Sequence, residues 1–196
     1  MIKAIIFDFD GVILESVDVK TNAFADIYSH FGEEIKNKVI KHHTLHGGIS
    51  RYNKFKIYHE QFLGIDLSDN DLNNLADTFS KKVIQKVIKA PYVTGAYEFI
   101  SNHFKYYDMY ISTATPTQEI EEILNSKNLM KYFKGVYGSP EEKVNHIRKI
   151  LDKKDYNTKE VVFIGDSTSD RDAARKNNIQ FIGRIGKNNS TLINEV

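Results

Sequence analysis

Two aspartates, Asp8 and Asp10, directly follow an apolar run near the start of the chain. The run ends at Phe7 and predicts a strand that is buried on both faces of a sheet. Since side chains alternate along an extended chain, the two aspartates can project to one side while Phe9 faces away. Gly11 then supplies a sharp exit from the strand. Two carboxylates so close together repel each other unless a cation neutralises one or they share a proton.

A magnesium ion is a suitable cation for this aspartate pair, because Mg²⁺ prefers hard oxygen ligands and keeps several waters. In open parallel α/β sheets, ligands bind at the carboxyl ends of the strands, where the pair lies. The alternative is that Asp8-Phe9-Asp10-Gly11 is only an acidic turn. The motif by itself does not separate these two interpretations.

Polar residues also follow two later apolar segments that we predict as strands. After the first, Thr113 can offer its hydroxyl and Ala114 its backbone N–H to a phosphate oxygen, although a Thr before a helix often serves only as its N-cap. Lys143, near the start of a later predicted helix, can reach a phosphate as a point charge or lie in solvent. Asp166 and Asp170 follow the second strand, where both can face a cation. Capping the next helix is a competing and compatible role for Asp170.

The segment after the first strand predicts only helices. Its apolar residues recur at helical spacing, and Gly, Ser or Asp marks the helix ends. The predicted helices cover residues 17–30, residues 33–42, a stretch between Ser50 and Gly64, and a stretch that begins at Ser68 or Asp69.

After Pro91, helices alternate with strands, which is the pattern of a parallel sheet with right-handed crossovers. The predicted strands cover 109–112, 135–137, 161–164 and 180–182, and the helices 96–103, 117–125, 141–151 and 170–177. We therefore expect an α/β protein with a Rossmann-like, doubly wound, parallel five-stranded sheet and an inserted all-helical segment. The expected domains are an α/β core, residues 1–14 and 91–196, and a helical cap, residues 15–90.

The composition narrows the class of partners. The chain of 196 residues has a net charge of +1 with interspersed signs, so it carries no electrostatic footprint for nucleic acid. It contains no cysteine, which excludes disulfides and a thiol nucleophile. The apolar runs are too short to span a membrane, and the early first strand leaves no room for a signal peptide. We expect a soluble, cytoplasmic protein, monomeric or weakly dimeric, without nucleic-acid or membrane partners.

In this order, the motifs resemble the haloacid dehalogenase superfamily of phosphatases and phosphomutases. The matching elements are Asp-x-Asp-Gly-Val at the first strand, a later strand that ends in Thr, a later Lys, and Gly-Asp-Ser-x-x-Asp. The resemblance covers the whole chain, because the helical segment lies where this family carries its small C1-type helical cap. Within the family, the chain looks like the branch that holds phosphoglycolate phosphatases and β-phosphoglucomutases.

The resemblance implies a role for each motif residue. Asp8 would be the nucleophile that forms an aspartyl-phosphate, and Asp10 the general acid/base. Thr113 and the Ala114 N–H would hold the phosphoryl oxygens, and Lys143 would neutralise negative charge beside them. The residues implied to hold Mg²⁺ are Asp8, Asp10 through its backbone carbonyl, Asp166, and Asp170 in contact with the metal or just behind its ligands.

Three cations of the predicted cap are candidate specificity residues. Arg51 and Lys54 follow the Gly47–Gly48 break, where related proteins place a loop over the active site. They can bind an acidic group of the substrate, or they can remain solvated at the start of a helix. Lys20 lies ten residues after Asp10, at a position where β-phosphoglucomutases carry a histidine used in gating. The lysine therefore favours a hydrolase over a mutase.

Three histidines in the cap, His42, His43 and His46, have a spacing at which two imidazoles can share zinc. No cysteine or nearby acidic ligand supports a zinc site, so we expect these histidines to be solvated or packed in a loop.

The expected function is a Mg²⁺-dependent phosphomonoester hydrolase that acts through an aspartyl-phosphate on a small phosphorylated metabolite, such as a sugar phosphate or phosphoglycolate. One alternative is a β-phosphoglucomutase-like phosphomutase. Another is a catalytically idle binding or regulatory module that has kept the fold. The presence of all the core motif residues argues against the idle module.

Overall fold

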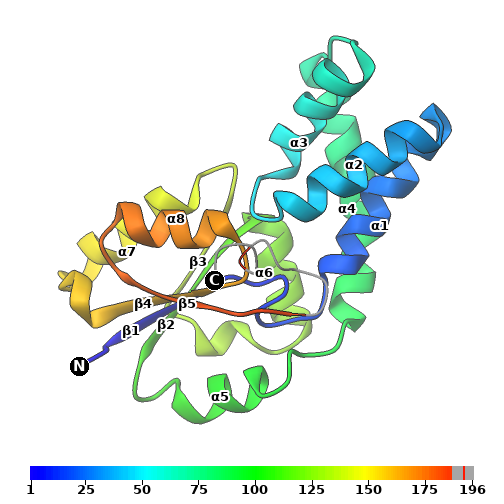
Figure 1. The fold of residues 1–196 in the computed structure, drawn as a ribbon. Coiled ribbons are helices and arrows are strands. Elements are labelled where there is room, and N and C mark those ends of the chain that lie inside the picture. The colour runs from blue at the N-terminus through cyan, green and yellow to red at the C-terminus, as the bar shows by residue number, and fades with distance from the viewer. Residues whose placement is uncertain (187–191, 193–196) are drawn as a thin grey trace.

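The computed structural model describes residues 1–186 and Leu192. A parallel five-stranded sheet lies at its centre, in the strand order β3-β2-β1-β4-β5 (Figure 1). The strands are β1 (Ala4–Phe7), β2 (Asp108–Pro116), β3 (Gly135–Ser139), β4 (Val161–Gly165) and β5 (Gln180–Gly183). The predicted α/β class and parallel sheet are confirmed. The last residues of the predicted core, 187–191 and 193–196, lie outside the described part of the chain.

Helices cover both faces of the sheet, because β1 is apolar on both sides. Ile5 and Phe7 share one hydrophobic cluster with residues of α5 and α6, whereas Ala4 and Ile6 share another with residues of α7 and α8. The sheet is therefore buried between two helical layers (Figure 1). The bounds of these helices are α5 (Ala96–His103), α6 (Thr117–Ser126), α7 (Lys143–Lys154) and α8 (Thr168–Lys176).

Four further helices pack on one another beside the carboxyl edge of the sheet (Figure 1). Their bounds are α1 (Val17–Tyr28), α2 (Glu33–Leu45), α3 (Arg51–Ile57) and α4 (Asp69–Lys89). Aromatic rings fill the space between them: the Phe24 ring lies 5.4 Å from that of Phe55 and 4.4 Å from that of Phe79. A π-helical turn extends α3 to Leu63 and ends at Gly64, whose φ of +66° is left-handed. Among the described residues, no helix is both long and apolar enough to cross a membrane.

The chain enters and leaves this helical segment at neighbouring points. The backbone N–H of Glu15 donates to the Pro91 carbonyl at 2.9 Å, and that of Val93 donates to the Ile13 carbonyl at 2.9 Å. The two connections are therefore held together beside the end of β1.

The end of β2 and the start of α8, both near the site, differ from the sequence prediction. β2 does not end at Ser112 but continues to Pro116, because after a shift in register it pairs further with β3. Helix α8 begins at Thr168, before the predicted start, because the N–H of Ser167 donates to the Asp170 carboxylate at 3.1 Å and closes the first turn. The end of β2 depends on pairing with another strand, whereas the start of α8 depends on a contact between residues three positions apart.

Candidate active site

Three aspartates meet at the carboxyl ends of β1 and β4. Asp8 follows β1, Asp166 follows β4, and Asp170 lies in the first turn of α8. One carboxylate oxygen of each lies within 4.8 Å of the others, and all three residues are buried. Gly165 permits this approach, because a Cβ there would lie 2.4 Å from the Asp170 Cβ. The structure thus brings together three of the four residues predicted as metal ligands.

The buried acidic cluster has the charge and the chemistry for a hard divalent cation. The pKa of Asp8 is raised to about 7, chiefly by burial; the charge of Lys143 opposes this rise, and those of Asp170 and Asp10 add to it. A cation beside these carboxylates would compensate their repulsion. An oxygen-only set with space for waters is the set that Mg²⁺ accepts. The donor set therefore fits the predicted metal.

Lys143 bridges two of these carboxylates. It is the first residue of α7, which begins at this position rather than at residue 141 as predicted. Its Nζ lies 3.0 Å from Asp8 Oδ2 and 2.6 Å from Asp170 Oδ1. Burial alone would lower the pKa of Lys143, but the charges of Asp170 and Asp8 raise it above its usual value, so the amine stays protonated. The alternative prediction, that Lys143 lies in solvent, is wrong because the residue is buried.

Asp10 has a separate set of partners. The Ser16 hydroxyl donates to it at 2.6 Å and the Thr115 hydroxyl at 3.1 Å. Lys20 forms an ion pair with the same carboxylate and donates to Thr115 Oγ1 at 2.6 Å. Burial would raise the pKa of Asp10, but the charge of Lys20 and these hydrogen bonds hold it below its usual value. Asp8 and Asp10 therefore have opposite pKa shifts although they are near neighbours in the chain.

Thr113 and Ala114 lie within β2 and line the same cavity as Asp8. Thr113 is buried, and its Oγ1 accepts the N–H of Thr115 at 3.2 Å. Because β2 continues past them to Pro116, Thr113 is not the N-cap of the next helix, and that alternative is wrong. Helix α6 begins at Thr117, the start that the sequence predicted.

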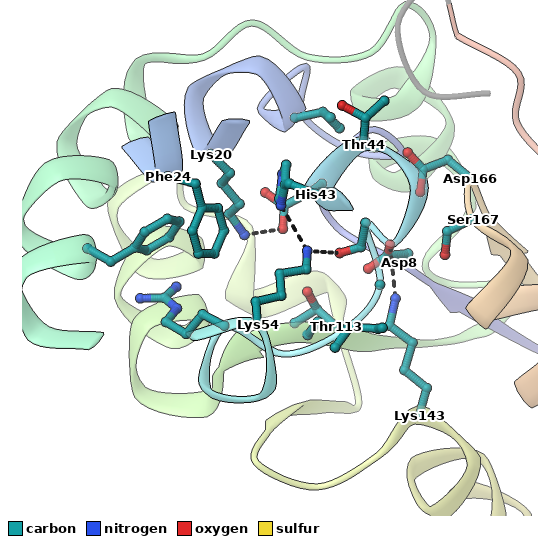
Figure 2. Close-up of a pocket in the computed structure, with 18 residues that line it drawn as sticks. Asp8, Lys20, Phe24, His43, Thr44, Lys54, Thr113, Lys143, Asp166 and Ser167 are labelled. Atoms are coloured by element: carbon teal, nitrogen blue, oxygen red, sulfur yellow. Dashed lines mark hydrogen bonds and ion pairs between the residues drawn. The ribbon is translucent and has the colours of Figure 1, made fainter. Parts of the chain in front are cut away.

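A cavity of about 60 Å³ lies between these strand ends and the helical segment (Figure 2). Because about 10–15 Å³ of such volume accommodates one water, it has room for a few atoms of that size. Its core-side lining includes Asp8, Asp10, Thr113, Ala114, Lys143 and Asp166. Its helical-side lining includes Lys20, Phe24, His43, Arg51, Lys54 and Phe79.

Arg51 lines the cavity but is already paired. Its Nη2 lies 2.7 Å from Glu119 Oε1, and its Nη1 donates to Ser80 Oγ at 2.6 Å. The side chains of Arg51 and Glu119 are each only 4 % exposed. The solvated alternative for Arg51 is therefore wrong, and contact with a substrate stays a prediction.

Lys54 is buried in the cavity wall with an unusual partner. Its Nζ lies 2.8 Å from His43 Nδ1 and donates to the Gly47 carbonyl at 3.3 Å (Figure 2). Among the described residues, no carboxylate lies within ion-pair distance of Lys54. Burial lowers the pKa of Lys54 well below its usual value, the charge of Lys20 lowers it further, and that of Asp10 opposes this. The solvated alternative is wrong for Lys54 as well.

The three histidines of the helical segment pack against other side chains and do not gather around a metal site. His43 is buried and its ring lies 4.9 Å from that of Phe24, while His42 Nδ1 lies 3.3 Å from Tyr58 Oη. Within residues 1–186 and Leu192, no histidine belongs to a group of three or more side chains that could hold a metal. His46 stacks near His42, with ring centres 4.5 Å apart.

The loop before α3 touches the core loop that carries Asp166. A Cβ at Gly48 would lie 1.8 Å from Ser169 Oγ and 2.9 Å from Ser167 Oγ. A side chain at position 48 would therefore require the hydroxyl of Ser169 to move. The helical segment closes on the acidic cluster at this point.

Four residues of the site were not anticipated from the sequence. Ser16 and Thr115 hold Asp10, His43 holds Lys54, and Glu119 holds Arg51. The alternation of Thr113 and Thr115 along one strand could have suggested that their side chains project to the same side. Nothing in the local pattern pointed to Glu119, which lies far from Arg51 in the sequence.

Together, these features define an α/β protein with an acidic, lysine-bridged site at the carboxyl edge of a parallel sheet. Residues 5–184 match the family model described as haloacid dehalogenase-like hydrolase. The chain belongs to this family of hydrolases, which confirms the resemblance and the assignment as an enzyme. No curated protein matched the sequence.

Solved structures share the fold over nearly the whole chain. A haloacid dehalogenase-like hydrolase from Streptococcus pneumoniae is 22% identical with a TM-score of 0.71, covering 98% of this chain and 90% of that chain. CbbY from Rhodobacter sphaeroides, in complex with phosphate, is 14% identical with a TM-score of 0.78, covering 97% and 89%. A predicted phosphoglycolate phosphatase from Haemophilus somnus is 16% identical with a TM-score of 0.71, covering 93% and 84%. At these identities, the likeness establishes the fold.

Proposed function

We propose that the protein is a magnesium-dependent phosphomonoester hydrolase that acts on a small phosphorylated metabolite through an aspartyl-phosphate on Asp8. The proposal rests on the different environments of Asp8 and Asp10. The two carboxylates line one cavity but have different partners and opposite pKa shifts. A carboxylate must be ionised to act as a nucleophile, and the nearby charge of Lys143 favours the ionised form of Asp8. An acid/base needs a fixed orientation, as Asp10 has from its hydroxyl partners.

A set of oxygen donors around Asp8 suits the metal and the phosphoryl group. The groups that would hold Mg²⁺ are the carboxylates of Asp8, Asp166 and Asp170 and the backbone carbonyl of Asp10. Bound there, Mg²⁺ would withdraw charge from the phosphoryl oxygens and make phosphorus more electrophilic. Lys143 adds a second positive charge, and the Thr113 hydroxyl and Ala114 N–H supply hydrogen bonds to the same oxygens.

The reaction then divides into two balanced steps. An Asp8 oxygen attacks phosphorus, the bond to the leaving oxygen breaks, and Asp10 gives that oxygen its proton. A water then attacks the aspartyl-phosphate, Asp10 takes the proton of this water, and inorganic phosphate leaves as the Asp8–phosphorus bond breaks. The ion pair with Lys20 keeps Asp10 ionised before substrate binds. An anionic phosphoryl group nearby raises the pKa of Asp10, so that it takes up from solvent the proton that it donates in the first turnover. In later turnovers, the proton that Asp10 takes from water in the second step serves this purpose.

We assign residues 15–90 as a cap that closes over an α/β core of residues 1–14 and 91–196, and the cations Lys20, Arg51 and Lys54 as specificity residues. The cavity lies between the two parts and is lined by all three cations. Lys54 is the best placed to meet a negative or hydroxyl-rich leaving group, because its amine has no carboxylate partner among the described residues.

The substrate class draws support from the size of the cavity and from related structures. A volume of about 60 Å³ suits a small ligand in the closed arrangement. CbbY was solved with phosphate and, as its D10N variant, with xylulose 1,5-bisphosphate, and another related structure is a predicted phosphoglycolate phosphatase. We therefore propose a sugar phosphate or a phosphoglycolate-like acid.

The decisive experiment is a screen for phosphate release across a panel of phosphorylated metabolites, with Mg²⁺ and with excess chelator. A hydrolase releases one inorganic phosphate for each substrate consumed, and only with the metal. Isomerised sugar phosphate with little free phosphate would identify a phosphomutase instead. Binding without turnover of any metabolite would indicate the idle module.

A further inference from the structure

A closed set of polar contacts joins three helices at one wall of the cavity. Arg51 on α3 lies 2.7 Å from Glu119 on α6 and donates to Ser80 on α4 at 2.6 Å. The Ser80 hydroxyl in turn donates to Glu119 Oε2 at 2.8 Å. The guanidinium carbon also lies 4.5 Å from the centre of the Phe79 ring. The two polar partners of the guanidinium, Ser80 and Glu119, are thus also bonded to each other.

The ion pair connects the two sides of the cavity. Glu119 lies in the first turn of α6, directly after the strand that carries Thr113 and Ala114, and a helix N-terminus favours its negative charge. Arg51 is the first residue of α3, directly after the loop that touches the core and one turn before Lys54. The position of α3 over the site is therefore tied to the position of β2 and α6.

Because the Arg51–Glu119 pair is buried, we expect it to fix the position of α3 more than to raise the stability of the fold. The attraction of a buried ion pair is largely offset by the cost of removing both charges from water. Either charge without its partner is strongly unfavourable in the interior, so the closed arrangement requires both side chains in register. An opening of the helical segment would separate Arg51 from Glu119 and hydrate both.

We propose that Glu119 is a positioning residue which, through Arg51, holds the segment of residues 15–90 closed over the site. Arg51 then contributes to specificity by fixing the position of α3, and the neighbouring Lys54 meets the substrate. The inference rests on the proposed function in so far as this segment is a cap. Its test therefore measures the position of the segment and does not require turnover.

The chain contains no cysteine, so two introduced cysteines can carry spin labels without interference. Lys56 and Lys153 are exposed. They lie on α3 and α7, which line the cavity from its helical side and its core side, so Lys56→Cys and Lys153→Cys place one label on each part. We expect one narrow distance distribution in this background, and a broader distribution with longer distances after Glu119→Gln. Glu121→Gln, an exposed change on the same helix, is the matched control and should leave the distribution narrow. A distribution unchanged by Glu119→Gln would overturn the proposal.

Arg51→Met tests the other half of the pair, and thermal unfolding confirms that each variant is folded. We expect Arg51→Met to broaden the distances as Glu119→Gln does, and the double variant to be no broader than the broader single variant, because both remove one contact. Additive broadening, or an Arg51→Met variant that stays narrow, would overturn the proposal.

A kinetic arm with 4-nitrophenyl phosphate and Mg²⁺ separates positioning from chemistry. Glu119→Gln should lower kcat/KM about tenfold, and Glu121→Gln should leave it unchanged. An equal rate for Glu119→Gln and the control, despite broadened distances, would show that closure does not serve catalysis and would overturn the positioning role. Absence of turnover in the unchanged protein would contradict the proposed hydrolase and leave the distance result intact.

Discussion

The two sides of the cavity balance their charges differently. On the core side, the Lys143 amine lies within 3.0 Å of Asp8 and 2.6 Å of Asp170, and its pKa is raised. On the helical side, the Lys54 amine is also buried, but its hydrogen-bond partners among the described residues are His43 and a backbone carbonyl, and its pKa is lowered. The core side thus holds a lysine with matched anions, and the helical side holds a lysine without one.

This contrast separates two tasks that a phosphatase must combine. A matched lysine is already positioned for the part of the reaction that every phosphate ester shares. An unmatched buried lysine is unfavourable until an anionic or hydrogen-bonding ligand arrives, so it can distinguish one leaving group from another. The predictions below test each side in turn.

The largest effect should follow from Asp8→Asn, which removes the proposed nucleophile and one carboxylate of the metal cluster. We expect phosphate release from the preferred metabolite to fall below about 1 % of the wild-type rate. Asp77→Asn, an exposed change on α4, is the control and should retain full activity. A folded Asp8→Asn protein that keeps more than a few per cent of the rate would contradict the assignment.

Lys143→Met should have the next largest effect, because it leaves Asp8 and Asp170 buried without their shared cation. We expect kcat/KM to fall by about 100- to 1000-fold. The acidic limb of the pH–rate profile should move to higher pH, because the lost charge of Lys143 opposes the raised pKa of Asp8. Lys149→Met, an exposed change on the same helix, should do neither.

Magnesium should stabilise the protein in a pH-dependent manner. Since the pKa of Asp8 is raised from 3.8 to about 7, its contribution to the metal-free fold is full below pH 3.8 and is lost as the pH rises through about 7. Protons and Mg²⁺ compete for the same carboxylate. Saturation with Mg²⁺ should therefore raise the Tm more at pH 8 than at pH 6. Equal shifts at both pH values, or the same pH dependence in Asp8→Asn, would count against Asp8 as a ligand.

Lys54→Met should have the smallest effect on rate, and it should make the protein more stable. We expect kcat/KM for the preferred metabolite to fall about tenfold, while the free energy of unfolding at pH 7 rises by about 1–2 kcal/mol. Because the folded-state pKa of Lys54 lies below 10.5, its cost grows as the pH falls below 10.5, so this gain should be larger at pH 7 than at pH 10. Lys56→Met on the same helix is the exposed control. A Lys54→Met protein that is less stable than the wild type would contradict the inference that the buried Lys54 amine has no neutralising anion.

Much of the fold and of the core side could be predicted from the sequence, because both depend on local order. The alternation of strands and helices after Pro91 indicates a parallel sheet, and residues that follow such strands meet at one edge. The sequence predicts that Asp8, Asp166 and Lys143 belong to the site, and this prediction does not require knowing which distant residues are in contact. The end of β2 was not predictable in this way, because its last residues are held by pairing with β3.

The helical side depends on contacts between residues far apart in the sequence, and periodicity does not identify such partners. Arg51 and Glu119 are 68 positions apart, and Lys20 and Thr115 are 95 apart. The helical pattern places Lys54 on a helix but does not show whether its amine reaches water or His43. Burial of these cations was therefore found only in the three-dimensional structure.

The paired connections at the ends of the helical segment have a consequence for how such a protein can change. Backbone hydrogen bonds from Glu15 and Val93 hold the two connections together, so the ends of the intervening chain lie side by side at the core. The entropic cost of a loop grows only with the logarithm of its length. The intervening chain can therefore lengthen, shorten or be exchanged for another segment while the acidic edge stays in place.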